Sequence, residues 1–419
     1  MTRRRIAILG GYATVQVLVQ AIAFASGLVL VRVLDQLEYG HYTLAISMVG
    51  MGGVLLDLGL STAVLATGGP FHANATRLRS LLGDAFKLQR WLLLGTVLLA
   101  PAFLYMLMRQ GLGAIVAVAL VLLVLASSAL GAYNAIALSI VRLRGDVNLQ
   151  QRLDMGVNLG KLMLVLSAAA VFIDALIAVA LNLFAAGITC WLLRSYLATH
   201  VGSTNASTGE AQPALRSFIR RQAPSSLYYC FMGQITIWLI GFLGDANRVA
   251  EVGALGRLAA VFAVVGAVLA AIVQPYFARR SHARELISGF VVLNVFFASL
   301  TAGLVVIAVL TPQALLWILG TRYAGLTYEV VWLVLSSSIG AWAAAIYGVG
   351  ASRGWLVPAI LQVPLGLCTL ALSCWAFDVS TVAGCLMLTS STVAVSLALA
   401  LAMVIQKLLA ACRSDRAPR

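Results

Sequence analysis

The chain has 419 residues, of which 62% are apolar and only 10% are charged, and its mean hydropathy is +0.99. Water-soluble domains are about 45–50% apolar and about 25% charged, so this composition excludes a soluble protein with an ordinary surface. The net charge is +14, but 25 of the 28 basic residues are Arg and they lie between apolar segments. This pattern favours membrane topology over a nucleic-acid partner, and we expect no nucleic acid to bind.

The N-terminus has three consecutive arginines, Arg3–Arg5, followed by apolar sequence to about Val31. We interpret it as a retained first helix because no convincing cleavage site for a signal peptide follows. About 20 apolar residues are needed to span a bilayer, and the whole pattern predicts an all-α polytopic membrane protein with twelve transmembrane helices. The predicted spans are residues 7–31, 39–66, 91–108, 112–140, 156–173, 176–198, 222–243, 250–277, 287–310, 328–351, 355–376 and 381–408.

The basic residues divide unequally between the two sides that these spans define. An even number of spans places both termini on one side, and that side carries 23 of the 28 basic residues. The other side carries only five, which are Arg32, Arg109, Arg248, Arg257 and Arg322. Cytoplasmic loops are rich in Lys and Arg, so we expect both termini in the cytoplasm and the protein in a bacterial inner membrane.

The longest polar insert divides the chain into two equal parts. It contains Gly202-Ser-Thr-Asn-Ala-Ser-Thr-Gly209, which is typical of a flexible linker. The sequence therefore predicts an N-terminal six-helix bundle at 1–200, a cytoplasmic linker at 201–218 and a C-terminal six-helix bundle at 219–419.

The two halves resemble copies of one unit. Five matches occur in order at offsets of 204 to 214 residues: Gln20 with Gln234, Glu38-Tyr-Gly40 with Glu251-Val-Gly253, Pro101 with Pro312, Tyr133 with Tyr347, and Phe172-Ile-Asp174 with Ala376-Phe-Asp378. Because six is even, both copies have the same orientation. Parallel repeats of this kind are common in transporters, where the substrate site lies between them.

Four segments resemble the polysaccharide flippases, the O-antigen and exopolysaccharide translocases of the multidrug/oligosaccharidyl-lipid/polysaccharide exporter superfamily. The first two helices of that family resemble Arg32-Val-Leu-Asp-Gln-Leu-Glu-Tyr-Gly-His-Tyr42 and Leu55-Leu-Asp-Leu-Gly-Leu-Ser-Thr62. The entry to its seventh helix resembles Phe218-Ile-Arg-Arg-Gln-Ala-Pro-Ser-Ser226, and the turn into its eighth resembles Glu251-Val-Gly-Ala-Leu-Gly-Arg257.

This resemblance implies a V-shaped pair of six-helix bundles that flips a lipid-linked sugar across the membrane by alternating access. It implies a substrate of the undecaprenyl-pyrophosphate type, contact with membrane lipids, and polysaccharide polymerase or assembly proteins as further partners. Family members often carry charges in the seventh helix, whereas Gln234-Ile-Thr-Ile-Trp238 is uncharged here. A charged site in that helix is therefore not expected.

Polar stripes recur in the first helix of each half. Tyr12, Gln16 and Gln20 share one helix face, and Ser226, Cys230 and Gln234 do the same in the seventh helix. Glutamine amides are costly in contact with lipid, so both stripes should face protein or a wet cavity. They are either two cavity walls that hydrogen-bond sugar hydroxyls or contacts between helices of one bundle.

Three charged residues are candidates for function. Asp57 is predicted near the cytoplasmic end of the second helix, as a charged group at an inner gate or as a helix-end carboxylate paired with Arg77 or Arg79. Arg257 lies in the eighth helix and Lys161 lies five or six residues into the fifth. Each either lines the cavity and holds an anionic group of the substrate or extends its long side chain toward the membrane surface.

Enzymatic and metal chemistry are not indicated. The four histidines lie near helix ends, far apart in sequence, and the six cysteines show no paired spacing. Gly156-Val-Asn-Leu-Gly-Lys-Leu162 only faintly resembles a phosphate-binding loop, since it is one residue short and lacks the following Ser or Thr. We expect no catalytic residue, metal or cofactor. The alternatives to a flippase are a drug/cation antiporter of the same superfamily, a glycan polymerase or ligase, and a non-transporting scaffold.

Overall fold

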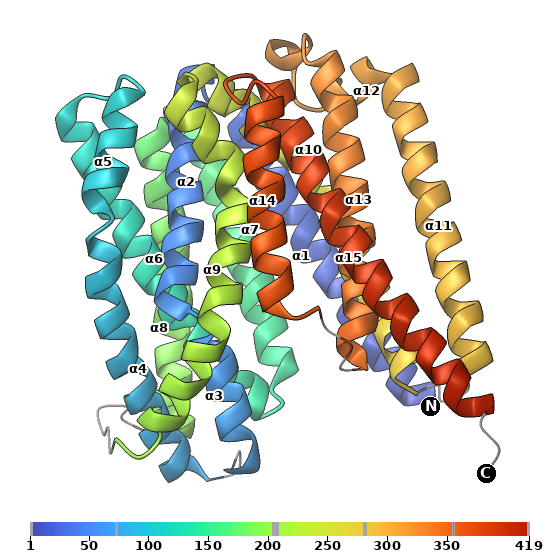
Figure 1. The fold of residues 1–419 in the computed structure, drawn as a ribbon. Coiled ribbons are helices and arrows are strands. Elements are labelled where there is room, and N and C mark those ends of the chain that lie inside the picture. The colour runs from blue at the N-terminus through green and yellow to red at the C-terminus, as the bar shows by residue number, and fades with distance from the viewer. Residues whose placement is uncertain are drawn as a thin grey trace. The chain divides into compact units, whose positions relative to one another are not determined.

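The computed structural model describes residues 3–71, 74–202, 209–279, 283–353, 355 and 357–416, and these residues are almost entirely helical (Figure 1). The first half contains α1 (Arg3–Val33), α2 (Gln36–Asp57), α3 (Leu60–Gly68), the 3-10 turn η1 (Gly69–Phe71), α4 (Ala75–Val97), α5 (Ala100–Arg109), α6 (Ala114–Leu143), α7 (Val147–Val171) and α8 (Ala175–His200). The second half contains α9 (Gln212–Leu243), α10 (Ala246–Arg279), α11 (Ala283–Leu310), α12 (Pro312–Trp317), the 3-10 turn η2 (Thr321–Tyr323), α13 (Thr327–Ser352), α14 (Ala359–Ala376) and α15 (Val382–Arg416).

Each predicted span coincides with a helix or a pair of helices in the described part of the chain. Among the described residues, ten segments are long and apolar enough to cross a membrane, and the pair α4 and α5, bent by 40°, makes eleven if it is one span. The predicted span at 250–277 coincides with α10. The all-helical, multi-pass fold predicted from the sequence is therefore confirmed.

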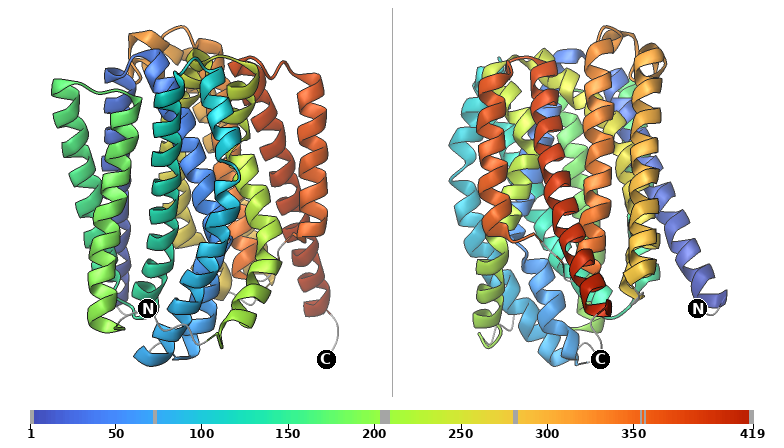
Figure 2. Two further views of the ribbon diagram at one scale, coloured as in Figure 1. Left: turned by 90° about the vertical axis from the view of Figure 1, so that its left-hand side faces the viewer. Right: turned by 45° about the vertical axis from the view of Figure 1, so that its right-hand side comes forward.

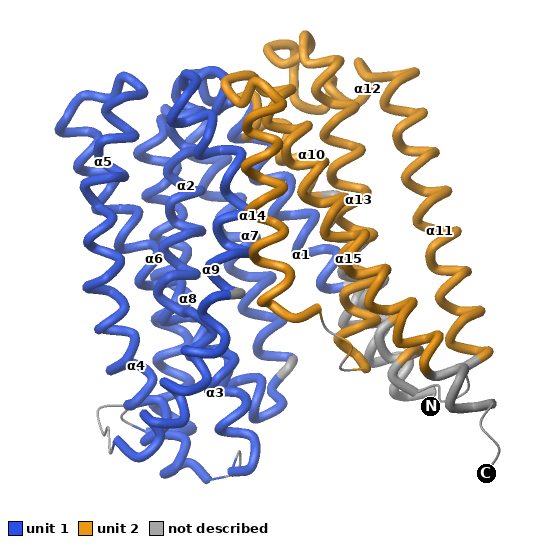
Figure 3. The backbone as a smooth tube through the Cα atoms, in the orientation of Figure 1, with its two compact units in different colours: residues 1–250 blue, residues 251–419 orange. Residues whose placement is uncertain are grey.

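The chain divides into two compact units, residues 1–250 and 251–419 (Figure 3). The first unit contains α1 to α9, because α9 packs against α2, α3, α4 and α5. The division predicted from the sequence, at the 201–218 linker, assigns α9 to the C-terminal bundle; in the structure α9 packs on α2, α3, α4 and α5 of the first compact unit.

The same helix pairings recur in both units, as expected for a repeated six-helix arrangement. The third span packs on the fourth, the fourth on the sixth and the fifth on the sixth, through α4–α6, α6–α8 and α7–α8 in the first half and α11–α13, α13–α15 and α14–α15 in the second. Figure 2 shows α7 and α8 as neighbouring antiparallel helices joined by a short turn.

Local chemistry repeats as well. Pro101 and Pro312 each lie in the first turn of a short helix, α5 and α12 respectively, that follows a longer helix, α4 or α11, and there a missing N–H has no intrahelical role. Asp174 accepts from the amide of Ile177 at the start of the sixth span, and Asp378 accepts from the amide of Ser380 just before the twelfth. Two of the five sequence matches thus include residues in similar local structural roles.

The core of the first unit is concentrated at one end, which we call the linker end because residues 209–211, which lead into α9, lie there. A buried apolar cluster joins α3, α4, α6 and α8 to the start of α9 through residues such as Leu60, Leu82, Ile140, Leu197 and Leu215. The opposite end carries the short turns before α2, α6 and α8, and we call it the far end. There the carboxylate of Glu38, in the first turn of α2, accepts from the amide of Ala175 at 2.9 Å and so caps α8.

Candidate functional site

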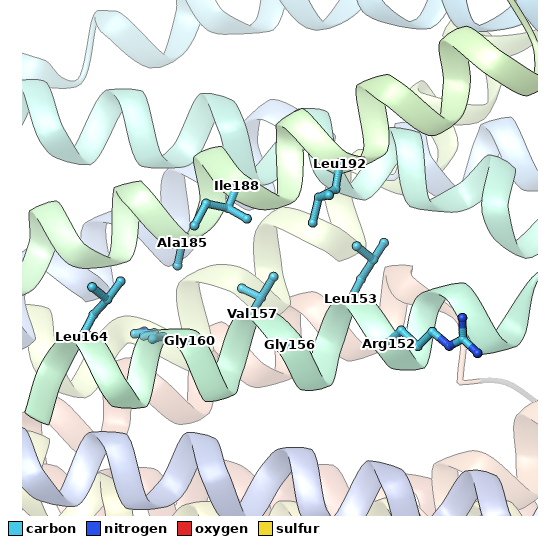
Figure 4. Close-up of a pocket in the computed structure, with 10 residues that line it drawn as sticks. Arg152, Leu153, Gly156, Val157, Gly160, Leu164, Ala185, Ile188 and Leu192 are labelled. Carbon is cyan, nitrogen blue, oxygen red and sulfur yellow. The ribbon is translucent and has the colours of Figure 1, made fainter.

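A crevice between α7 and α8 has a cation at its side and glycines along its floor (Figure 4). Its volume is about 250 Å³. The residues that line it are Arg152, Leu153, Gly156, Val157, Gly160, Lys161 and Leu164 of α7 and Ala185, Ile188 and Leu192 of α8. These ten residues include two basic side chains and no carboxylate, so the crevice is apolar along its walls and positively charged.

The crevice exists because two positions of α7 have no side chain. A Cβ atom added at Gly156 or at Gly160 would meet no heavy atom of its neighbours within 4 Å. The spacing of four residues places both glycines on the same helix face, toward α8. Small residues in a membrane helix usually bring two backbones together, but here they leave open space.

Lys161 lies much deeper in its helix than the sequence predicted. Since α7 begins at Val147, Lys161 is 14 residues from one end and ten from the other, or about 21 and 15 Å at 1.5 Å per residue. The polar first turns of α7 resemble a loop in hydropathy, which explains the error. The Nζ of Lys161 donates to Oδ1 of Asn182 on α8 at 2.8 Å, and Asn182 was not found from the sequence.

The position of this lysine is energetically costly. A Lys at the centre of a membrane helix costs about 2.5–3.5 kcal/mol on insertion scales, and such residues are rare and functional by default. Arg152, nine residues earlier on α7 and exposed, lies about 14 Å away along the helix axis. The two cations therefore mark a path from the polar start of α7 to the middle of the span.

Asp57 lies at the break between α2 and α3, where Leu58 and Gly59 have φ values of 40° and 83°. Its carboxylate accepts from the amide of Ser61 at 2.8 Å and from the Ser61 hydroxyl at 3.0 Å. It thus caps the restarted helix and does not pair with the arginines considered in the sequence analysis. Arg79 Nε instead donates to the carbonyl of Val201 at 2.9 Å.

The predicted glutamine stripes have different environments. Gln16 is half-buried and Gln20 is exposed on α1, while the side chain of Tyr12 lies outside the described residues. Gln234 on α9 lies against α2, with its Nε2 3.4 Å from the place that a Cβ of Gly50 would occupy. For Gln234 this contact fits the helix-packing alternative. Arg257, on α10, is half-buried and has an interaction partner.

Asp84 is a buried acid that the sequence analysis missed. It lies on α4 before the predicted span at 91–108, because α4 begins at Ala75 and extends beyond its apolar part. Its side chain is 0% exposed and accepts from the amides of Gly209 at 2.9 Å and Ala211 at 3.0 Å, and from Nε2 of Gln212 at 3.3 Å. It caps α9 from a different helix.

A second groove, of about 690 Å³, lies between α6 and α8. Its lining residues are apolar, among them Phe184 and Trp191, which are exposed. Among the described residues, no group of three or more His, Cys, Asp or Glu is placed to hold a metal ion. Of these two pockets, the α7–α8 crevice combines charge with apolar walls.

The fold is that of transporters of the MOP superfamily. A multidrug resistance MATE family transporter in an inward-facing conformation is similar, with a TM-score of 0.69 at 13% identity over 96% of this chain and 99% of that one. The lipid II flippase MurJ, in an inward closed conformation, gives a TM-score of 0.73 at 11% identity over 96% of this chain and 89% of that one. A MOP superfamily transporter from Pyrococcus furiosus, described by the reverse polarity of its binding pocket, gives 0.63 at 13% identity over 97% and 96%. No family model and no curated protein sequence matches the chain.

Proposed function

We propose that this protein translocates a lipid-linked saccharide that carries phosphate groups across the membrane. The observation that carries the proposal is Lys161, a cation in the middle of a span beside an open crevice. A cation at that depth suits an anionic ligand, and an ammonium group is a common point-charge partner for phosphate.

The walls of the crevice support a ligand with both polar and apolar parts. Leu153, Val157 and Leu164 on α7 face Ile188 and Leu192 on α8. A hydrocarbon chain can pack against these apolar side chains, while a phosphate group of the same lipid is attracted by Lys161 and Arg152. A lipid-linked sugar has this combination of chemistry.

A drug/cation antiporter of the same superfamily is the second candidate, and the likeness to a MATE transporter favours it. A cationic substrate or coupling ion calls for a carboxylate in the binding cavity. The ten residues that line the α7–α8 crevice include none, while Asp57 and Asp84 accept hydrogen bonds near helix termini. The likeness to the lipid II flippase MurJ agrees better with a lipid-linked substrate.

The proposal is tested with the full-length protein reconstituted into proteoliposomes. A fluorescent polyprenyl-diphosphate saccharide is included in the membrane, and translocation is followed by the change in the fraction that an impermeant quencher reaches. Losing a hydrogen bond to a charged group costs about 1.5–3 kcal/mol, so at about 1.4 kcal/mol per tenfold we expect Lys161→Ala to slow translocation roughly 10- to 150-fold. Lys161→Arg should retain part of the rate, since it keeps the charge.

A second pair of variants distinguishes the effect of the open crevice from the effect of the charge on Lys161. Gly160→Leu fills the crevice and should slow translocation although Lys161 remains. Gly95→Leu, at an exposed glycine on α4 with the same open space, is the matched control and should translocate like the parent. Parent protein that moves a cationic dye but not the lipid-linked saccharide would identify the antiporter instead.

A further inference from the structure

Helix α9 is fastened to the first bundle at its linker end by Asp84. The backbone amides at the start of a helix have no intrahelical acceptor, and the amides of Gly209 and Ala211, in the turn that leads into α9, find theirs in the buried Asp84 carboxylate of α4. Leu215, in the first turns of α9, is fully buried in the apolar cluster of α3, α4, α6 and α8. Moving α9 away would break both contacts together.

The far end of α9 is fastened by Gln110, which follows α5. Its side chain is buried, and its Nε2 donates to the carbonyl oxygens of Gly241 and Gly244, which end α9. These carbonyls belong to the last turn of the helix, where intrahelical donors are missing. The backbone carbonyl of Gln110 in turn accepts from Nε2 of the buried His41 on α2 at 3.1 Å.

Contacts between these two ends join α9 to α2 and α3. Trp238 Nε1 donates to Oγ of Ser47 at 3.2 Å. Toward the linker end, a Cβ atom on Gly59 would lie 3.3 Å from the Cβ of Gln222. We call this set of contacts between α9 and the rest of the first bundle the seam. It extends from the first turns of α9 to its last turn, with a buried polar side chain, Asp84 or Gln110, at each end.

We propose that α9, although it is the first helix of the second repeat, moves with the first bundle during transport. The moving boundary then lies at Gly244 and Asp245, between α9 and α10, and not at the linker before α9. Gly244 follows the last residue of α9 and has an extended backbone conformation. The next helix, α10, begins after Asp245, whose carboxylate accepts from the amide of Arg248 at 2.9 Å. A boundary at the linker would require both buried anchors to open in every cycle.

Cross-linking across the seam tests the inference. In a background in which all six cysteines are replaced by alanine, Gly59→Cys with Gln222→Cys joins α3 to α9. The Cβ separation of 3.3 Å is close to the 3.5–4.5 Å of disulfides. Because Gly59 has a φ of 83°, a second pair, Ser47→Cys with Trp238→Cys, is joined by a short bifunctional thiol reagent as an independent link. Each single-cysteine variant treated in the same way is the control.

We expect both cross-links to form almost completely and to leave the rate of lipid-linked saccharide translocation within twofold of the uncross-linked protein. Loss of translocation on cross-linking, restored by reductant, would overturn the proposal. So would failure of both pairs to link.

A distance measurement by paired spin labels decides the point even if the proteoliposomes translocate no saccharide. Labels replace the exposed Leu243 of α9 and either Leu122 of α6 or Leu372 of α14. Between detergent and lipid nanodiscs, and with or without the polyprenyl-diphosphate saccharide, the 243–122 distance should stay within about 2 Å of one value. A 243–122 distribution that shifts or splits, while that of 243–372 stays fixed, would place α9 with the second bundle.

Discussion

Replacing Asp84 by alanine should loosen the start of α9 without disturbing the rest of the first unit. The carboxylate is 0% exposed and accepts from the amides of Gly209 and Ala211. Alanine leaves these donors without that partner in a buried place. Asp84→Asn keeps one side-chain oxygen as an acceptor, so its effect should be smaller than that of alanine. It should still weaken the contact, because the amide nitrogen of asparagine is a donor where the second carboxylate oxygen of Asp84 accepts.

The size of the effect follows from the number of donors. Each buried donor left unsatisfied costs about 1–3 kcal/mol, and loss of a helix cap typically costs about 1 kcal/mol. Water entering the gap offsets part of this cost. We therefore expect the substitution to lower the local free energy of opening by about 2–4 kcal/mol. At about 1.4 kcal/mol per tenfold, amide exchange at these positions should speed up roughly 30- to 700-fold.

The assay is hydrogen–deuterium exchange of the protein in detergent, read from peptides that contain residues 209–216. Glu210→Ala is the matched control, because it removes an exposed carboxylate from the same segment. Peptides from α6 should exchange alike in all variants. If Asp84→Ala exchanges no faster than Glu210→Ala in the 209–216 peptides, then Asp84 does not hold the start of α9 and the argument for the linker-end anchor fails.

Three further predictions follow from the same reasoning. Topology reporters after Gly111, Asp245 and Asp378 should be external and reporters within 203–209 cytoplasmic, and a cytoplasmic reading at Asp245 would contradict the division of basic residues. Arg257→Ala should sharply reduce complementation of a flippase-null strain at equal protein level, with Arg257→Lys restoring part of it; normal complementation by the alanine variant would remove Arg257 from the site. Gly40→Ala should lower the apparent melting temperature by several degrees, because its Cβ would lie 2.1 Å from the carbonyl oxygen of Ala246. Gly53→Ala on the same helix, where a Cβ meets open space, should not, and equal melting of the two variants would contradict the close approach.

The sequence predicts the helices well because apolar segments of membrane length dominate it. All twelve predicted spans coincide with helices in the described part of the chain, and the repeat is visible in matched residues such as Pro101 and Pro312. Helix ends are predicted less well. Both α4 and α7 begin well before their most apolar parts, at Ala75 and Val147, because their polar first turns resemble loops in hydropathy.

The candidate site is predicted only in part, for reasons of geometry. Lys161 is visible as a charge in a span, but its depth depends on where α7 begins, and its partner Asn182 is brought to it by the packing of α8. Gly156 and Gly160 lie at the start of the predicted span 156–173, but only the packing of α7 on α8 shows that they line a crevice. Asp84 could not be linked to α9 from sequence, because 125 and 127 residues separate it from the amides it caps.

Site-specific photo-cross-linking in native membranes tests most directly whether the α7–α8 crevice holds a lipid-linked anionic saccharide. A photoreactive phenylalanine replaces Leu164, which lines the crevice, or Leu166, which is 44% exposed and does not line it. The account predicts that the protein with the probe at 164 acquires a polyprenyl-phosphate lipid, identified by mass spectrometry, and that Lys161→Ala lowers the yield roughly tenfold or more. The protein with the probe at 166 should acquire only bulk phospholipid. Equal capture of the same lipids at both positions, or a yield at 164 that does not depend on Lys161, would contradict it.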